Sequence, residues 1–414
     1  MAKSIKKLSL SSMALISIIS LMASTSTQIL NPIIAVYARD TLNASITEIG
    51  LIISAFFFVS IISKPLIGLS CQGMKTLYYL WIALALMAFP TIGMSVTNSP
   101  AIFAALRIFQ GIGSSMFWAP GMTLIALISS KDRLEQDLSN YSFLISIGMS
   151  LGPAIGSMSV AVLGTRYSFF LSALILLSGF MMGTLLIRKR EYFREKLCSD
   201  DSRINSLHQL PQIVSTKPFK MAFLAYATMS FIYGILTAYG TLYFKDSFGV
   251  QDGTVAILFF GYNAIIMVTR FGLRKLVNIT SKRNILLFGL ANYVVMLSIL
   301  VTSNSLPIFV AAFCMLGLSH GLIYPTGILM VAGSVPIANL AFANSIYLTG
   351  WDVGNSIGPV VASPIATQYG TRAALPIAIL APIVSLLITV LYLREPPKKT
   401  DTRIETKEEH FGAS

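Results

Sequence analysis

"GMSLGPAIG", residues 148–156, returns 206 positions later as "GNSIGPVVA", residues 354–362. Both copies lie within long apolar runs. Glycines four residues apart let two membrane helices approach closely, and the proline that follows removes a backbone donor and bends its helix. The repetition predicts a close, bent helix contact at matched places in two halves of the chain, either a flexure beside a pathway or tight packing alone. The residues concerned are Gly148, Gly152, Pro153, Gly354, Gly358 and Pro359.

The composition is that of a membrane protein. Of 414 residues, 55% are hydrophobic and only 11% are charged, whereas about a quarter are charged in soluble domains. Twelve apolar runs are long enough to cross about 30 Å of hydrocarbon, and short connections leave no room for a soluble catalytic domain. We predict an all-α integral membrane protein with spans near 9–38, 46–70, 76–96, 100–128, 139–163, 167–187, 219–244, 253–273, 284–304, 307–333, 339–365 and 373–393.

Further matches occur at the same spacing of 206 residues. Gly111 pairs with Gly317, and the "GTR" at Gly164 returns at Gly370. These matches predict two six-helix halves around a central cavity. Because each half holds an even number of spans, the halves share one orientation, and a solute site is expected between them near the midplane. The predicted parts are 1–187, a cytoplasmic linker 188–218, 219–393 and a cytoplasmic tail 394–414.

The net charge of +13 is a topology signal. With a cytoplasmic N-terminus, 23 of the 30 lysines and arginines fall in cytoplasmic segments. This asymmetry follows the positive-inside rule, so both termini are expected in the cytoplasm of a multi-pass cell-membrane protein, and nucleic-acid binding is not expected.

The N-terminus also has some features of a secretory signal. Lys3, Lys6 and Lys7 precede an apolar run, as in a cleaved signal. The run continues to Ala38, however, which is too long for such a signal. We therefore interpret it as the first span.

The sequence contains few candidates for catalysis. Three cysteines and three histidines are scattered without metal-ligand spacing. We find no pairing of a nucleophile with a base and no glycine loop for phosphate. No enzyme activity, metal or cofactor is expected.

The arrangement of spans and two motifs resemble the major facilitator superfamily over essentially the whole chain. The stretch at Gly148 is similar to the antiporter motif of drug and metabolite exporters. "LRIFQGIGSS", residues 106–115, resembles a fourth-span motif whose arginine, here Arg107, is linked to proton coupling. The resemblance implies gating positions at Lys64 and Arg270. The acid usual in the adjoining loops is replaced by Gln72 and Asn278, which puts the family's acidic latch in doubt.

Two charged residues inside spans are candidates for proton coupling. Asp352 lies in the middle of the predicted span 339–365, and Arg107 lies in the span 100–128. An ionised group at this depth is costly unless it faces water or a partner. Asp352 is thus either a titrating group or a structural hydrogen-bond partner, and Arg107 is either part of the coupling or a fixed charge that holds helices together.

Polar side chains at intervals of three and four residues mark helix faces in four spans. In the resembled fold these spans, the first, fourth, seventh and tenth, line the central cavity. Each residue alone fits packing better than ligand binding, and the coincidence of four such faces is the stronger signal. The predicted cavity residues are Gln28, Asn31, Ser114, Trp118, Tyr226, Tyr233, His320 and Tyr324.

The leading hypothesis is a monomeric secondary transporter that exports small amphipathic organic molecules in exchange for protons. An importer or facilitator of a sugar or organic acid is the alternative. A membrane sensor is disfavoured because the segments 188–218 and 394–414 are short for a signalling domain.

Overall fold

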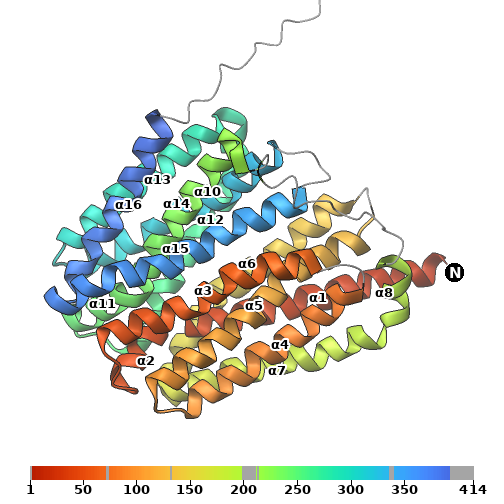
Figure 1. Ribbon diagram of the computed structural model, residues 1–414, viewed down its shortest axis with the longest axis horizontal. Helices are drawn as coiled ribbons and strands as arrows, with labels where there is room; N and C mark the ends of the chain where they lie inside the picture. Colours follow the sequence, from red (N-terminus) through yellow and green to blue (C-terminus); the bar gives the residue numbers. More distant parts are fainter. Residues whose placement is uncertain are drawn as a thin grey trace, which may run out of the picture.

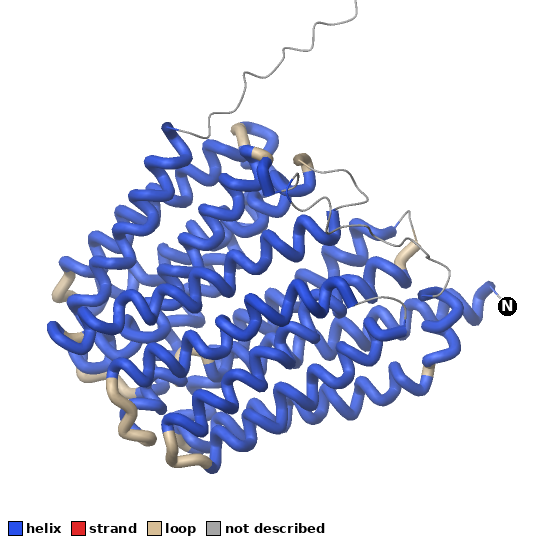
Figure 2. Tube along the Cα trace, in the orientation of Figure 1, coloured by secondary structure: helices blue, strands red, loops and turns tan. Residues whose placement is uncertain are grey.

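The computed structural model describes residues 2–70, 74–130, 133–197, 211, 214–334 and 340–391. The predicted tail 394–414, the linker residues 198–210 and 212–213, and Gln72 lie outside the described residues, as does the side chain of Asn278. The described chain is built of long, roughly antiparallel helices (Figures 1 and 2).

The described residues of the first half form eight α-helices. They are α1 (Ala2–Leu30), α2 (Ile34–Asp40), α3 (Ile46–Ser70), α4 (Met74–Val96), α5 (Pro100–Ile128), α6 (Leu134–Leu163), α7 (Thr165–Arg188) and the polar α8 (Arg190–Leu197).

The second half repeats this order. It consists of α10 (Lys217–Ile235), the π-helical turn η2 (Leu236–Gly240), α11 (Thr241–Phe248), α12 (Asp252–Ile279), α13 (Lys282–Thr302), α14 (Leu306–Ala332), α15 (Leu340–Tyr369) and α16 (Thr371–Leu391).

The predicted all-α membrane fold with twelve long helices in two repeats is confirmed. Eleven of the described helical segments are long and apolar enough to cross a membrane. The remaining long helix, α15, spans 30 residues and is not one of these eleven; it carries Asp352 and Asn355. Large apolar side chains such as Val162, Phe271 and Ile279 are exposed on the bundle surface, as a lipid-facing surface requires.

The first span differs from its prediction. A single helix over 9–38 was expected, but α1 ends at Leu30 and α2 begins at Ile34. Pro32 has no backbone donor and its ring clashes with a helical carbonyl four residues earlier, so the helix stops there. Shifting this break by 206 residues places it on η2, so the leading helix of each repeat is irregular at the same point.

The two repeats match closely in detail. Shifting α6 by 206 residues gives the bounds of α15, and Gly164 and Gly370, which precede the next helices, have φ of 90° and 88°. Such backbone angles favour glycine.

The glycines of the quoted stretches lie at matched helix crossings. A Cβ atom at Gly152 of α6 would lie 2.5 Å from the Gln28 Cβ of α1, and one at Gly358 of α15 would lie 2.6 Å from the Phe231 carbonyl oxygen of α10. Pro153 and Pro359 follow directly within the same helices. At these matched crossings, the helix backbones therefore leave no space for a side chain.

The repeats meet along two lines of contact. Helix α3 packs against α15, and α6 packs against α12. We call the end of the bundle with the N-terminus the near end, and the end with the loops 41–45 and 249–251 the far end (Figure 1). At the far end, α2 of the first repeat contacts α11 of the second.

Candidate functional site

A buried ion pair joins the repeats where α3 meets α15. The Lys64 Nζ atom lies 2.5 Å from Asp352 Oδ2, and the side chains of Lys64 and Asp352 are 16% and 2% exposed. In the described part of the chain, Asp352 is the one carboxylate among the buried side chains. It therefore combines a titratable group with a contact between the two repeats.

The matched contact on the other side lacks the carboxylate. Arg270 of α12 is displaced by 206 residues from Lys64, and Ser146 of α6 by the same number from Asp352. Arg270 Nη1 donates to Ser146 Oγ at 2.9 Å. The two pairs of equivalent positions thus differ: one contact holds an ion pair, and at the other a guanidinium group hydrogen-bonds a hydroxyl group.

Arg107 of α5 is 4% exposed and has polar and aromatic neighbours. Its Nη1 donates to Gln110 Oε1 at 2.6 Å, and its guanidinium lies 4.4 Å from the centre of the Phe56 ring. Its Nε has no hydrogen-bond partner. Among the described residues, no ion pair joins Arg107 to a carboxylate; the cation that pairs with Asp352 is Lys64.

Seven aromatic side chains of the second repeat that carry an N–H or O–H group contact one another beside Asp352, and we call them the aromatic cluster. Tyr226 stacks on Tyr347 with centroids 4.7 Å apart, and Tyr233 lies 5.1 Å from Trp351. The Tyr262 hydroxyl hydrogen-bonds His320 Nδ1 at 2.7 Å. The members are Tyr226, Tyr233, Tyr262, His320, Tyr324, Tyr347 and Trp351.

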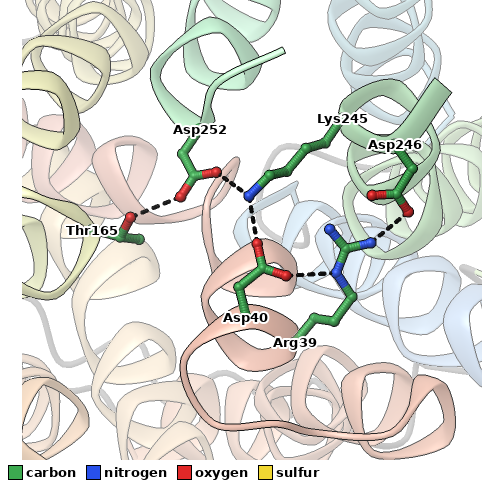
Figure 3. Close-up of polar contacts among 6 residues, drawn as sticks. All are labelled: Arg39, Asp40, Thr165, Lys245, Asp246 and Asp252. Carbon is green, nitrogen blue, oxygen red and sulfur yellow. Dashed lines mark hydrogen bonds and ion pairs between the residues drawn. The ribbon is translucent and has the colours of Figure 1, made fainter. Parts of the chain in front are cut away.

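Charged side chains also link the repeats at the far end (Figure 3). Arg39 of α2 lies 2.5 Å from Asp246 of α11, and Asp40 of α2 pairs with Lys245 of α11. Lys245 also lies 2.5 Å from Asp252, whose other oxygen accepts a bond from the Thr165 hydroxyl. These six residues are called the far-end network.

The far-end network perturbs the titration of its acid on α2. Partial burial tends to raise the pKa of Asp40, but hydrogen bonds and attraction from Arg39 and Lys245 outweigh it and hold that pKa below its usual value. Asp40 therefore stays ionised and paired down to unusually low pH.

A family model described as Major Facilitator Superfamily matches residues 16–303 and 275–414. The chain belongs to the Major Facilitator Superfamily. It is accordingly a membrane transporter, with a small-molecule substrate and the lipid bilayer as its surroundings.

Several curated relatives of this superfamily member are transporters. It is 21% identical to an uncharacterized MFS-type transporter of Methanocaldococcus jannaschii, over 82% of this chain and 87% of that protein. It is 26% identical to the multidrug resistance protein MdtG of Dickeya zeae, over 78% of this chain and 79% of that protein. The human synaptic vesicular amine transporter is 28% identical, but over 34% of this chain and 28% of that protein.

Solved structures share the fold at low sequence identity. The nucleoside transporter NupG gives a TM-score of 0.76 at 12% identity, with 91% of this chain and 98% of that chain covered. An inward-facing, occupied bacterial homologue of the human lysosomal transporter Spinster gives 0.72 at 11% identity, with 93% and 98% covered. These similarities concern the fold.

The transporter brings some of the predicted cavity residues together and leaves others apart. Tyr226, Tyr233, His320 and Tyr324 share the aromatic cluster. Asn31, directly after α1, donates its amide N–H to Gln28 Oε1 of α1 at 3.3 Å. Ser114 is buried on α5, and Trp118 packs edge-on against Phe117 in the core of the first repeat.

Three members of the aromatic cluster were missed from the sequence. Tyr262 and Tyr347 lie 206 residues after Phe56 and Tyr141. In the first repeat, the Phe56 carbonyl faces Gly111 and the Tyr141 hydroxyl faces Gly121. The repeat therefore relates Tyr262 and Tyr347 to residues at glycine crossings. Trp351 directly precedes Asp352. Following the repeat outward from its glycines would have identified all but Trp351.

Two small cavities lie beside the buried arginines. One is lined by Arg107, Asn31, Tyr233 and Thr237 together with apolar side chains of α2 and α3, and the other by Arg270, Ser146, Asn263 and neighbouring methionines. Each has a volume of about 10 Å³, roughly the space needed for one water molecule. Neither cavity therefore has room for an organic solute in this conformation.

Proposed function

We propose that this transporter exports small amphipathic organic molecules across the cell membrane in exchange for protons, by alternating access. The observation that carries the proposal is the Lys64–Asp352 pair. It places a buried titratable carboxylate on the contact between the two repeats. A group in that position responds both to protons and to the relative movement of the repeats.

Protonation of Asp352 weakens the contact between α3 and α15. The ionised carboxylate attracts the Lys64 ammonium in a site of low polarity, whereas the neutral acid does not. Removing one charge of a buried pair costs about 3–5 kcal/mol because the other is left uncompensated. Because Lys64 is partly exposed, leaving its charge uncompensated costs less than this. The direction is the same, and a bound proton favours separation of the repeats at this contact.

The far-end network provides the opposing contact. Arg39 and Asp40 belong to the first repeat, and Lys245 and Asp246 belong to the second (Figure 3). Alternating access requires that the repeats part at one end while they stay joined at the other. The network holds the far end while Asp352 takes up or releases its proton.

The aromatic cluster suits an amphipathic solute. Its rings present large apolar faces, and its hydroxyl groups and His320 supply a few directed hydrogen bonds. The similarity to a multidrug resistance protein over most of both chains supports export.

We further propose that the halves 1–187 and 219–393 move as units, that the linker 188–218, the tail 394–414 and both termini are cytoplasmic, and that the protein is a monomer. The distribution of basic residues supports this orientation. Labelling of a cysteine introduced at Ser202 should fail from outside intact cells, and efficient labelling would reverse the topology.

The proposal is tested by solute flux in proteoliposomes with an imposed pH gradient. The wild type should accumulate solute on the acidic side, and Asp352→Asn should lose accumulation while keeping exchange of solute for solute. Glu191→Gln, an exposed substitution on α8, serves as the matched control. Gradient-driven accumulation by the Asn variant at the wild-type rate would remove Asp352 from the coupling, and accumulation on the alkaline side would favour the import alternative.

A further inference from the structure

We propose that the transported solute is an organic anion, namely a carboxylate attached to an aromatic or apolar body, and that Arg107 and Arg270 bind its charge. This inference rests on the proposed transport function and adds the substrate class to it. The observation behind it is a pair of buried guanidinium groups that lack acidic partners where the repeats meet.

The charges inside the bundle do not balance. Away from the helix ends, the described long helices carry the cations Lys64, Arg107 and Arg270 and the single anion Asp352. Asp352 is paired with Lys64. In the described part of the chain, neither arginine has a carboxylate partner. Uncompensated charge is costly at membrane depth, and a bound anion would offset that cost.

The Arg107 site offers several hydrogen-bond donors. Its Nη1 is directed to Gln110, while its Nε has no partner and the side chain lines a cavity. Asn31 and Tyr233, whose side chains also carry donors, belong to the same lining, and the Asn31 amide nitrogen donates to Gln28 at 3.3 Å. A planar guanidinium with neighbouring donors matches the geometry of a carboxylate.

The Arg270 site combines an available donor with an aromatic surface. Its Nη1 donates to Ser146, and its Nε has no partner. Its guanidinium lies 5.4 Å from the centre of the Tyr324 ring. Asn263 and Met267 line the adjoining cavity. An anion held here would lay its apolar body against methionine and tyrosine side chains.

The aromatic cluster connects the two sites. Tyr233 belongs to the cluster and lines the Arg107 cavity, and Tyr324 belongs to the cluster and packs under Arg270. Arg107 lies towards the far end of α5, whereas Arg270 lies in the half of α12 nearer the near end. An anion leaving Arg270 therefore meets aromatic faces on its way to Arg107.

An organic cation is the competing substrate class, since aromatic rings and a carboxylate are its usual partners. Here, however, the carboxylate is already bound to Lys64, whereas both guanidinium groups lack an acid. The charge that the site lacks is negative.

The test measures thermal stabilisation of the purified full chain by matched probes. Each probe set has one body and three head groups: hydrocinnamate, its amide and the matching primary amine, with parallel sets on naphthalene and indole. The carboxylates should stabilise the wild type most. Arg107→Gln and Arg270→Gln should each weaken the apparent carboxylate affinity by about tenfold or more, the usual consequence of losing a charge-assisted hydrogen bond.

Two further variants separate binding from misfolding. Arg133→Gln removes an exposed guanidinium at the near end and should bind as the wild type does. Arg107→Lys retains the charge and should lose less affinity than Arg107→Gln. The inference is overturned if carboxylates stabilise the wild type no more than their amides do, or if amines stabilise it most.

The outcome is distinguishable from failure of the proposed function. Carboxylate binding that depends on both arginines, together with flux that ignores the pH gradient, would keep the substrate class and remove proton coupling. Gradient-driven flux of an amine or amide would keep proton coupling and remove the proposed substrate class.

Discussion

Two contacts related by the internal repeat both carry a cation, but one of them carries an acid as its partner. At α3 and α15, a lysine meets an aspartate; at α6 and α12, an arginine meets a serine. Ser146 and Asp352 each lie twelve residues from the first residue of their helix. The repeat has kept the cation in both contacts and the acid in one.

This difference shows how a nearly symmetric fold can respond asymmetrically to protons. A cation facing a hydroxyl is insensitive to pH in the physiological range, because serine does not titrate there and arginine keeps its proton. The contact with Asp352 changes when a proton binds. We therefore propose that the contact with Asp352 carries the pH sensitivity and that the other contact is free to hold a solute anion.

Making the two contacts alike by removing the acid should have the largest effect. Asp352→Ser copies the α6 contact onto α15 and leaves Lys64 without an ionic partner. Gradient-driven accumulation in proteoliposomes should fall to the background of empty vesicles. Wild-type accumulation would show that the difference between the contacts has no role in coupling.

Filling a tight helix crossing should impair transport next most strongly and in both repeats equally. Gly152→Leu would drive a side chain into Gln28 and the backbone of α1, and Gly358→Leu into the backbone of α10. Overpacking of this kind costs about 1–3 kcal/mol or more. Because about 1.4 kcal/mol corresponds to a factor of ten, we expect the flux per inserted protein to fall roughly tenfold. Full flux in both variants would show that neither crossing is tight.

Making the contacts alike by adding an acid should have a smaller effect. Ser146→Asp places a carboxylate against Arg270. The new ion pair should raise the melting temperature and slow transport several-fold, because the repeats then hold together at both contacts. If carboxylate probes stabilised this variant as strongly as the wild type, Arg270 would not be their binding group.

The far-end network should give the smallest effect. The folded pKa of Asp40 lies below its usual value because Arg39 and Lys245 bind the ionised form. Its stabilisation is thus fully present above the ordinary carboxylate pKa and is lost as the pH falls through the lowered folded value. Asp40 is partly exposed, so Asp40→Asn should cost no more than about 1 kcal/mol.

The check is a series of melting temperatures against pH for the wild type and Asp40→Asn. The two curves should differ at neutral pH and converge in acid. Curves separated by a constant amount at every pH would show that the charge of Asp40 does not stabilise the far end.

The sequence predicts the fold well because apolar runs and the repeat are both local patterns. The bounds of α3 and α5 agree with the predicted spans residue for residue. The break at Pro32 was missed because both flanking segments are apolar, and hydropathy does not distinguish one helix from two.

The candidate site is predicted less completely, since its partners come from distant parts of the chain. Asp352 and Lys64 were each noticed, but 288 residues separate them. Nothing in the local sequence states that Asp352 meets Lys64. The repeat relates this pair to Ser146 and Arg270, but that relation is informative only after the contact between Asp352 and Lys64 is known.

The most direct measurement follows the distance between the repeats at the near end as the pH changes. Spin labels at Leu66 of α3 and Leu387 of α16, both exposed near that end, would be introduced after Cys71, Cys198 and Cys314 are replaced by serine. On acidification, the distance in the wild type should lengthen, and Asp352→Asn should show the longer distance in acidic and alkaline buffer alike. A wild-type distance that ignores pH, or an Asn variant that follows pH as the wild type does, would contradict a proton-sensitive contact at Asp352.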